Sequence, residues 1–213
     1  MILYIIRHGD PDYANDTLTE YGWRQAEALG ERMAKEKLDL IYTSPMGRAI
    51  ATAEPTCRKT GIQSSIEPWM AEHIDYMRSP DFKNDVEYNF SFKKGVTEYK
   101  DYYQGERGEF IQKMIDSSDE FLARHGYVRE GGIYRIAEPS NKRIACFCHG
   151  GFGAAWISHL LGLPATFDWF KITMYTTCVT KLSFYDFDKT GYAQVTAEYI
   201  ADVSHNVYGG VKP

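Results

Sequence analysis

The segment ILYIIRHGDPDY, residues Ile2–Tyr13, decides the fold. Its first five residues are apolar or aromatic, and they favour a strand buried on both faces, which is typical of a parallel sheet. The apolar run then ends in Arg7, His8 and Gly9. Because ligands of open α/β sheets bind beyond the carboxyl ends of the strands, Arg7 and His8 are the first candidate site residues.

The segments after this strand alternate between helix and strand. Thr19 is a candidate N-cap, and an apolar stripe predicts a helix from there to about Lys35. The next helix covers Met46–Gly61, kinked or ended near Pro55 and closed by its glycine. The other expected elements are strands at Asp39–Ser44, Ile62–Pro68, Lys142–Gly150, Cys178–Phe187 and Ala193–Asp202, helices at Gly108–Gly126 and Gly151–Gly162, a hairpin at Tyr127–Glu138, and a tail at the end of the chain. This alternation predicts βαβ units and an α/β fold.

The alternation breaks between Trp69 and about Arg107, where aromatic, charged and glycine residues mix with weak periodicity. We therefore expect residues 1–213 to form a single domain, with an insertion at about 69–107 that packs over one end of the sheet.

Charge and cysteine content narrow the class of protein. The net charge of −5 argues against broad nucleic-acid binding, which needs a basic surface. No segment approaches the roughly 20 apolar residues of a membrane span, and the N-terminal apolar run is too short for a signal peptide. The four cysteines have neither zinc-site nor disulfide-framework spacing. We expect a cytoplasmic protein; the sequence leaves its oligomeric state open.

Two further strand ends carry polar groups. Ser44 follows the second strand with Arg48 one turn into the next helix, and His149-Gly150 follows the strand after the insertion. Two arginines and two histidines are therefore expected to converge. A phosphate group explains such a set, because guanidinium groups bind its oxygens bidentately and an imidazole can attack phosphorus. Gly150 would let the backbone approach the phosphate closely.

Four motifs make the interpretation specific: LYIIRHG, LTEYGWRQAEALG, YTSPMGRAIATA and CFCHGG. In this order and at these separations they resemble the histidine phosphatase superfamily, the phosphoglycerate mutase-like proteins. The resemblance implies a three-layer α/β/α fold with a mostly parallel central sheet and an insertion capping the active site. It also implies a phosphomonoesterase that acts on a small phosphorylated metabolite through a phosphohistidine, without a metal or another cofactor.

The resemblance assigns roles to particular residues. His8 would be the nucleophile, while Arg7, Arg48 and His149 would form the phosphate pocket with Gly150. The proton donor of the family follows the third strand, where this chain has Glu72. An asparagine often stands six residues after the nucleophile; Ala14 occupies that position here, and Asn15 is the candidate for the phosphate contact.

Other interpretations stay open. A phosphoglycerate mutase would use the same residues and return the phosphoryl group to another hydroxyl. A metal-dependent hydrolase would use His8, Asp10, Asp12 and His149, and a non-catalytic module would bind the phosphorylated ligand without turnover. Asp10, His73 and Asp75 could replace Glu72 as the acid. His125 and His205 belong to no motif and are expected at the surface.

Overall fold

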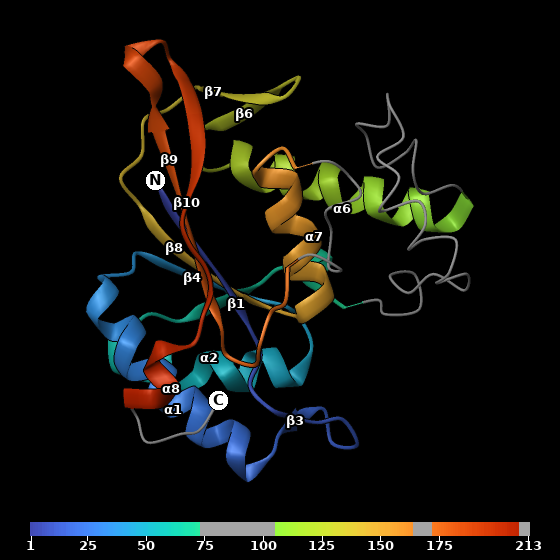
Figure 1. Ribbon diagram of the computed structural model, residues 1–213, viewed down its shortest axis with the longest axis vertical. Helices are drawn as coiled ribbons and strands as arrows, with labels where there is room; N and C mark the ends of the chain where they lie inside the picture. The colour runs from blue at the N-terminus through green and yellow to red at the C-terminus, as the bar shows by residue number, and fades with distance from the viewer. Residues whose placement is uncertain (73–104, 164–171, 209–213) are drawn as a thin grey trace.

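The computed structural model describes residues 1–72, 105–163 and 172–208 (Figure 1). Within these residues one sheet has the strand order β5-β4-β8-β1-β9-β10-β7-β6. Its strands are β1 (Ile2–Arg7), β4 (Leu40–Thr43), β5 (Ser64–Ile66), β6 (Tyr127–Glu130), β7 (Ile133–Ile136), β8 (Arg143–Cys148), β9 (Val179–Asp186) and β10 (Tyr192–Asp202). Strands β5, β4, β8 and β1 run parallel, and β9, β10, β7 and β6 extend the sheet in antiparallel fashion.

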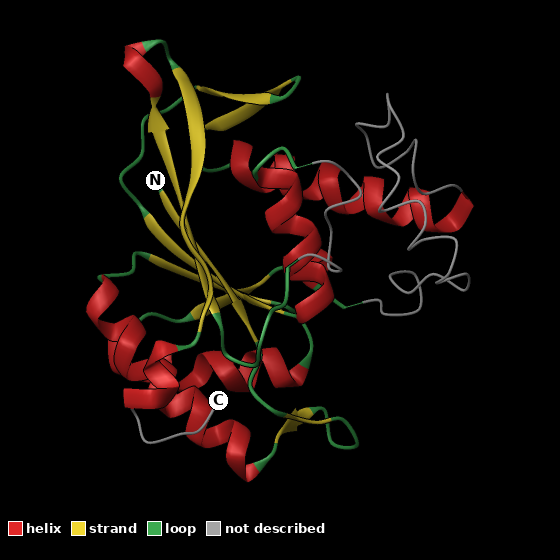
Figure 2. Cartoon of the chain, viewed as in Figure 1, coloured by secondary structure: helices red, strands yellow, loops and turns green. Residues whose placement is uncertain are grey.

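Helices cover both faces of the parallel half (Figure 2). Helices α1 (Glu20–Met33) and α2 (Gly47–Thr60) lie on one face with the short α8 (Ser204–Tyr208), and α6 (Gly105–Ala123) and α7 (Gly150–Leu160) lie on the other (Figure 1). A small ribbon of β2 (Pro11–Asp12) and β3 (Thr17–Leu18) follows β1, and single turns of 3₁₀ helix lie at Ala34–Glu36, Pro68–Met70 and Phe187–Lys189. The predicted three-layer α/β/α class is confirmed.

Strand β1 shows why the sheet is buried on both sides. Leu3 and Ile5 join the core beneath α6 and α7, whereas Tyr4 and Ile6 join the core beneath α1 and α2. All four side chains have no exposed surface. Successive side chains of a strand point to opposite faces, so a continuous apolar run is what a central strand requires.

Helix termini follow their sequence signals. Thr19 caps α1 by accepting a hydrogen bond from the Gly22 amide at 3.0 Å. Helix α2 ends at Gly61, which adopts a left-handed conformation with φ of 74°. The alternative that α2 ends near Pro55 is wrong, because the helix continues through this residue to Thr60. Gly30 of α1 leaves room for the buried Pro55 ring.

Three expectations about the periphery need correction. The C-terminal residues before 209 form helix α8 instead of a tail. His125 and His205, expected at the surface, are 8% and 5% exposed. His125 packs against the rings of Tyr42 and Phe121, and His205 bonds to Arg32 and Thr177. These contacts join segments far apart in the chain, so local sequence carries no signal for them.

Most of the predicted insertion, including His73 and Asp75, lies outside the described residues. Helix α6 starts at Gly105, slightly before the predicted start. The hairpin at Tyr127–Glu138 is confirmed as β6 and β7. In the described parts of the chain, no helix has the length and apolar character needed to cross a membrane.

Candidate active site

The carboxyl ends of the parallel strands bring the predicted residues together. Arg7 and His8 end β1, Ser44 follows β4, and His149 follows β8 as the N-cap of α7. The rings of His8 and His149 lie with their centroids 5.2 Å apart at 61°. His149 Nε2 and the Ser44 hydroxyl are 2.7 Å apart, which fixes the His149 ring against the end of β4.

His8 is held in one orientation and one tautomer. Its side chain is 3% exposed, and Nδ1 lies 2.7 Å from the Gly9 carbonyl oxygen. A carbonyl oxygen can only accept, so Nδ1 carries the proton and the lone pair of the neutral ring is on Nε2. The backbone is fixed as well, because the Gly9 amide donates to the Thr52 hydroxyl at 2.9 Å.

The surroundings of His8 keep its ring neutral. Burial lowers the pKa of His8 to about 4, with the charges of Arg7 and Arg48 acting in the same direction and the Gly9 hydrogen bond opposing them. At neutral pH, His8 therefore presents an uncharged, nucleophilic nitrogen beside two permanent cations.

Arg7 is positioned by backbone groups. Its Nη1 donates to the Met174 carbonyl, and its Nε is buried without a hydrogen-bond partner among the described residues. The guanidinium lies against Gly150, where an added Cβ would sit 3.2 Å from Arg7 Nε. Gly150 thus permits the close approach of Arg7 to the N-terminus of α7.

Arg48 enters from the first turn of α2 and is 7% exposed. Its Nη1 donates to the Asp16 carboxylate at 2.7 Å, and its Nη2 lies 3.2 Å from the Met46 sulfur. Like Arg7, Arg48 has a buried Nε with no partner in the described part of the chain. Buried donors are normally satisfied, so both guanidinium groups point to an anionic ligand.

Glu72 reaches the same site from the segment after β5. Its carboxylate accepts hydrogen bonds from the amides of Gly151 at 3.3 Å and Phe152 at 3.1 Å, at the N-terminus of α7. Burial raises the pKa of Glu72, against the hydrogen bonds and the charges of Arg48 and Arg7. Glu72 therefore keeps its proton to a higher pH than an exposed glutamate would, which suits a proton donor.

The described contacts of Asn15 are with Asp12 and with none of these groups. It is exposed, and its side-chain amide donates to the Asp12 carboxylate at 2.7 Å. Its role in phosphate contact stays a prediction. Asp10, the alternative acid and metal ligand, accepts a hydrogen bond from the Thr19 hydroxyl. The four residues of the metal-dependent alternative form no metal-binding group in the described structure.

Three supporting residues were missed by the sequence interpretation. Asp16 binds Arg48, the Met174 carbonyl binds Arg7, and Gln25 links two loops of the site. Gln25 is 1% exposed, accepts from the Asp10 amide, and donates to the Thr176 hydroxyl, each at 2.9 Å. Gln25 lies within one of the quoted motifs, so the sequence could have pointed to it. Its partners, Asp10 and Thr176, could not be predicted, because they depend on the path of two loops.

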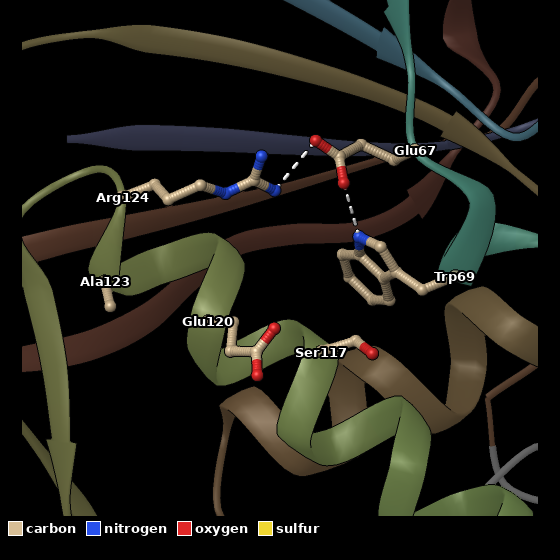
Figure 3. Close-up of a pocket in the computed structure, with 6 residues that line it drawn as sticks. All are labelled: Glu67, Trp69, Ser117, Glu120, Ala123 and Arg124. Atoms are coloured by element: carbon tan, nitrogen blue, oxygen red, sulfur yellow. Dashed lines mark hydrogen bonds and ion pairs between the residues drawn. The ribbon is translucent and has the colours of Figure 1, made fainter.

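A separate cavity of about 690 Å³ lies between the segment after β5 and helix α6 (Figure 3). Glu67 accepts hydrogen bonds there from Trp69 Nε1 and Arg124, both at 2.8 Å. None of the predicted site residues lines it; the lining residues are Glu67, Trp69, Ser117, Glu120, Ala123 and Arg124. Both oxygens of Glu67 accept hydrogen bonds from the protein, and the described lining has no histidine beside its arginine.

Comparison with known families and proteins adds independent information. A model of the histidine phosphatase superfamily (branch 1) matches residues 3–195. A probable phosphoglycerate mutase from Photorhabdus laumondii is 26% identical over 173 residues, which are 76% of each chain. A putative phosphoserine phosphatase from Hydrogenobacter thermophilus is 32% identical over 79 residues, covering 33% of this chain and 39% of that protein.

Solved structures share the fold. A mycobacterial glucosyl-3-phosphoglycerate phosphatase superposes with a TM-score of 0.66 at 21% identity, covering 94% of this chain and 98% of that one. A phosphoserine phosphatase from Entamoeba histolytica, in complex with 3-phosphoglyceric acid, superposes with a TM-score of 0.66 at 20% identity and covers 96% and 98%.

Proposed function

This chain belongs to the histidine phosphatase superfamily, branch 1, and on that premise we propose that it is a phosphomonoesterase acting on a small phosphorylated metabolite in the cytoplasm. One observation carries the proposal. Two guanidinium groups, Arg7 and Arg48, each have a buried Nε with no partner among the described residues, and their charges act on a neutral imidazole, His8. This combination suits an anion that is attacked by a nitrogen nucleophile.

In the first step we assign the attack to Nε2 of His8. The lone pair forms a bond to phosphorus while the bond from phosphorus to the leaving oxygen breaks. Glu72 gives its proton to that oxygen, so the alcohol leaves uncharged. The phosphorylated ring is cationic, and its Nδ1 proton stays hydrogen-bonded to the Gly9 carbonyl. Arg7, Arg48 and His149 hold the phosphoryl oxygens.

In the second step the Glu72 carboxylate accepts a proton from water, and the water oxygen forms a bond to phosphorus. The nitrogen–phosphorus bond breaks, phosphate leaves, and His8 returns to its neutral form. The arginines supply the charge stabilisation that a metal ion supplies in other phosphoryl transfers. Glu72 thus serves as acid and then as base, which fits a carboxyl group whose pKa is raised by burial.

The relatives support a small metabolite as the substrate. Their names refer to phosphoserine, phosphoglycerate and glucosyl-3-phosphoglycerate. Each of these compounds carries its phosphate on a short polar molecule. We expect substrate selectivity to depend on the predicted insertion at 69–107, most of which lies outside the described residues. Neither the acidic net charge nor the site indicates a nucleic-acid partner.

Phosphate release from a panel of phosphomonoesters, with a chelator present, tests the proposal. We expect turnover by the wild type, a loss of at least about 10³-fold for His8→Ala, and little change for a matched control, His159→Ala. His159 lies near the far end of α7, where its ring contacts Asp119. Activity that survives in His8→Ala would overturn the assignment, as would activity that requires an added metal.

A phosphoglycerate mutase is the second candidate, because a relative at 26% identity carries that name. A mutase would transfer the phosphoryl group from His8 to a hydroxyl of phosphoglycerate, and it would depend on priming by a bisphosphoglycerate. Measuring isomerisation and phosphate release in the same reaction separates the two. Isomerisation that exceeds release would favour the mutase.

A further inference from the structure

Asp16 forms an ion pair with Arg48, one of the proposed phosphate-binding residues. Its Oδ1 accepts from Arg48 Nη1 at 2.7 Å, and its Oδ2 accepts from the Gly47 amide at 2.6 Å. Gly47 is the first residue of α2, so the carboxylate also faces the positive end of that helix. Arg48 is 8% exposed at its side chain and Asp16 48%, so the pair joins a buried cation to the loop at the surface.

The backbone at this point is adapted to the contact. Asp16 has a φ of 46°, which is unusual for a residue other than glycine. A Cβ at position 47 would lie 2.1 Å from the Asp16 carbonyl oxygen, so this approach requires glycine. The local geometry therefore brings the Asp16 carboxylate to the arginine at the cost of a constrained backbone.

Two more side chains lie against the Arg48 guanidinium. The Tyr13 ring centroid lies 5.5 Å from Cζ of Arg48, and Met46 contacts Nη2. Two of the three guanidinium nitrogens are thus occupied by protein atoms. Nε, which is buried without a partner among the described residues, is the nitrogen that these contacts leave to a ligand.

We propose that Asp16 is the positioning residue of the phosphate site: it anchors Arg48 through Nη1 so that the remaining guanidinium edge is oriented toward the phosphoryl group. The inference rests on the proposed phosphatase function. An arginine side chain has many rotamers, and an anchor that fixes one of them removes the ordering cost from each binding event. Asp16 itself touches no reacting atom and acts through Arg48.

A matched set of substitutions tests this role. Asp16→Ala removes both carboxylate contacts, whereas Asp16→Asn keeps one acceptor for Arg48. Glu27→Ala is the control, because the Glu27 carboxylate is likewise paired with an arginine of α2, Arg58, but at the exposed surface. For para-nitrophenyl phosphate we expect kcat/KM to fall about tenfold in Asp16→Ala, as for a lost charge-assisted hydrogen bond, and less in Asp16→Asn. Glu27→Ala should stay near the wild-type value.

A double-mutant cycle separates positioning from a general structural effect. If Asp16 acts through Arg48, Asp16→Ala should change kcat/KM little in an Arg48→Ala background. The inhibition constant of inorganic phosphate should rise in parallel with the loss of kcat/KM, because phosphate uses the same guanidinium edge. Equal losses from Asp16→Ala in both backgrounds would overturn the proposal.

A lower inhibition constant of phosphate in Asp16→Ala would also overturn the proposal. That result would show that the Asp16 carboxylate competes with phosphate for Arg48 and does not position the arginine for it. A wild type that hydrolyses no phosphomonoester would instead overturn the proposed function. Binding of inorganic phosphate, measured by isothermal titration calorimetry on the same variants, would then still test the anchor. Unchanged binding in Asp16→Ala would contradict it.

Discussion

His8 and Glu72 show how one site prepares two residues for opposite tasks. Burial is the largest influence on both groups, and it favours the neutral form of each. A neutral histidine has a lone pair to attack phosphorus, and a neutral carboxyl group has a proton to give. The same physical cause therefore produces the nucleophile and the acid that the proposed reaction needs.

The role of Glu72 predicts a dependence on the leaving group. In Glu72→Ala we expect kcat/KM to fall about 10²-fold for an alkyl phosphate, which needs a protonated leaving oxygen. The loss should be much smaller for para-nitrophenyl phosphate, whose leaving group departs as a stabilised anion. Steady-state kinetics on the two substrates give the comparison, and equal losses on both would contradict Glu72 as the acid.

The pH profile gives a second prediction for the same pair. The acid limb of kcat/KM should lie near pH 4, where His8 takes up a proton and loses its lone pair. The alkaline limb should lie above the ordinary range of a glutamate, because the pKa of Glu72 is raised and activity falls as its proton is lost. Glu72→Gln should abolish the alkaline limb alone; a profile unchanged by that substitution would exclude Glu72 as its source.

At the residue scale, the sequence placed the groups that end buried strands. Arg7, His8 and His149 follow apolar runs, and the parallel sheet brings such positions together. The partner of Arg48 was not predictable in this way. Asp16 contacts Arg48 from a short loop in which Asp16 itself has a positive φ. The pattern of residue types does not predict the path of such a loop.

At the scale of elements, α1 and α2 pack closely through one small residue. A Cβ at Gly30 would lie 3.0 Å from Cβ of Pro55 and 3.1 Å from its carbonyl carbon. This contact shows how closely α1 approaches α2 at Pro55. Helix caps and the glycine at the end of α2 were predictable from local chemistry. The continuation of α2 through Pro55 was not, because a proline disfavours the interior of a helix.

We predict that Gly30→Ala destabilises the protein although alanine favours helix formation. Overpacking against Pro55 should cost about 1–3 kcal/mol, and the gain in helix propensity offsets at most about 1 kcal/mol. Urea unfolding measures the difference. Gly132→Ala is the control, because that exposed glycine has open space around its added methyl group. Equal stability of Gly30→Ala and the wild type would refute the packing explanation.

At the scale of the whole molecule, three of the buried histidines lie in different parts of the fold and share a lowered pKa. Burial lowers the pKa of His8, His125 and His205 to about 4 in each case. In the unfolded chain a histidine titrates near 6.5. Between these values the unfolded state binds more protons than the native state, so the free energy of unfolding falls as pH is lowered from about 6.5 to 4.

This linkage predicts that replacing one of the three histidines weakens the dependence of the free energy of unfolding on pH. Each histidine contributes at most about 1.4 kcal/mol per pH unit within the window. His125→Phe should flatten the dependence without loss at pH 7.5, because neither ring nitrogen has a partner among the described residues and its neighbours are aromatic. Urea unfolding at several pH values measures the slope; an unchanged slope would contradict the assignment to His125.

The large-scale architecture was predictable because the alternation of strands and helices constrains it strongly. Two βα units, β1-α1 and β4-α2, and the strand β5 precede residue 73, and β1, β4 and β5 form the parallel part of the sheet together with β8. The antiparallel extension beyond β9 places β6 and β7 at the sheet edge, which depends on pairings between distant segments. Such pairings leave no local signal beyond the hairpins themselves.

Trapping the covalent phosphohistidine is the sharpest test of His8 as the nucleophile. Glu72→Ala should still accept phosphate from para-nitrophenyl phosphate but should release it slowly, because water lacks its base. After a brief reaction and an alkaline quench, intact-mass and peptide analysis should find one phosphoryl group on His8, stable in base and lost in acid. A phosphoryl group on any other residue, or turnover by the wild type with no phosphoryl group trapped in either protein, would contradict the account.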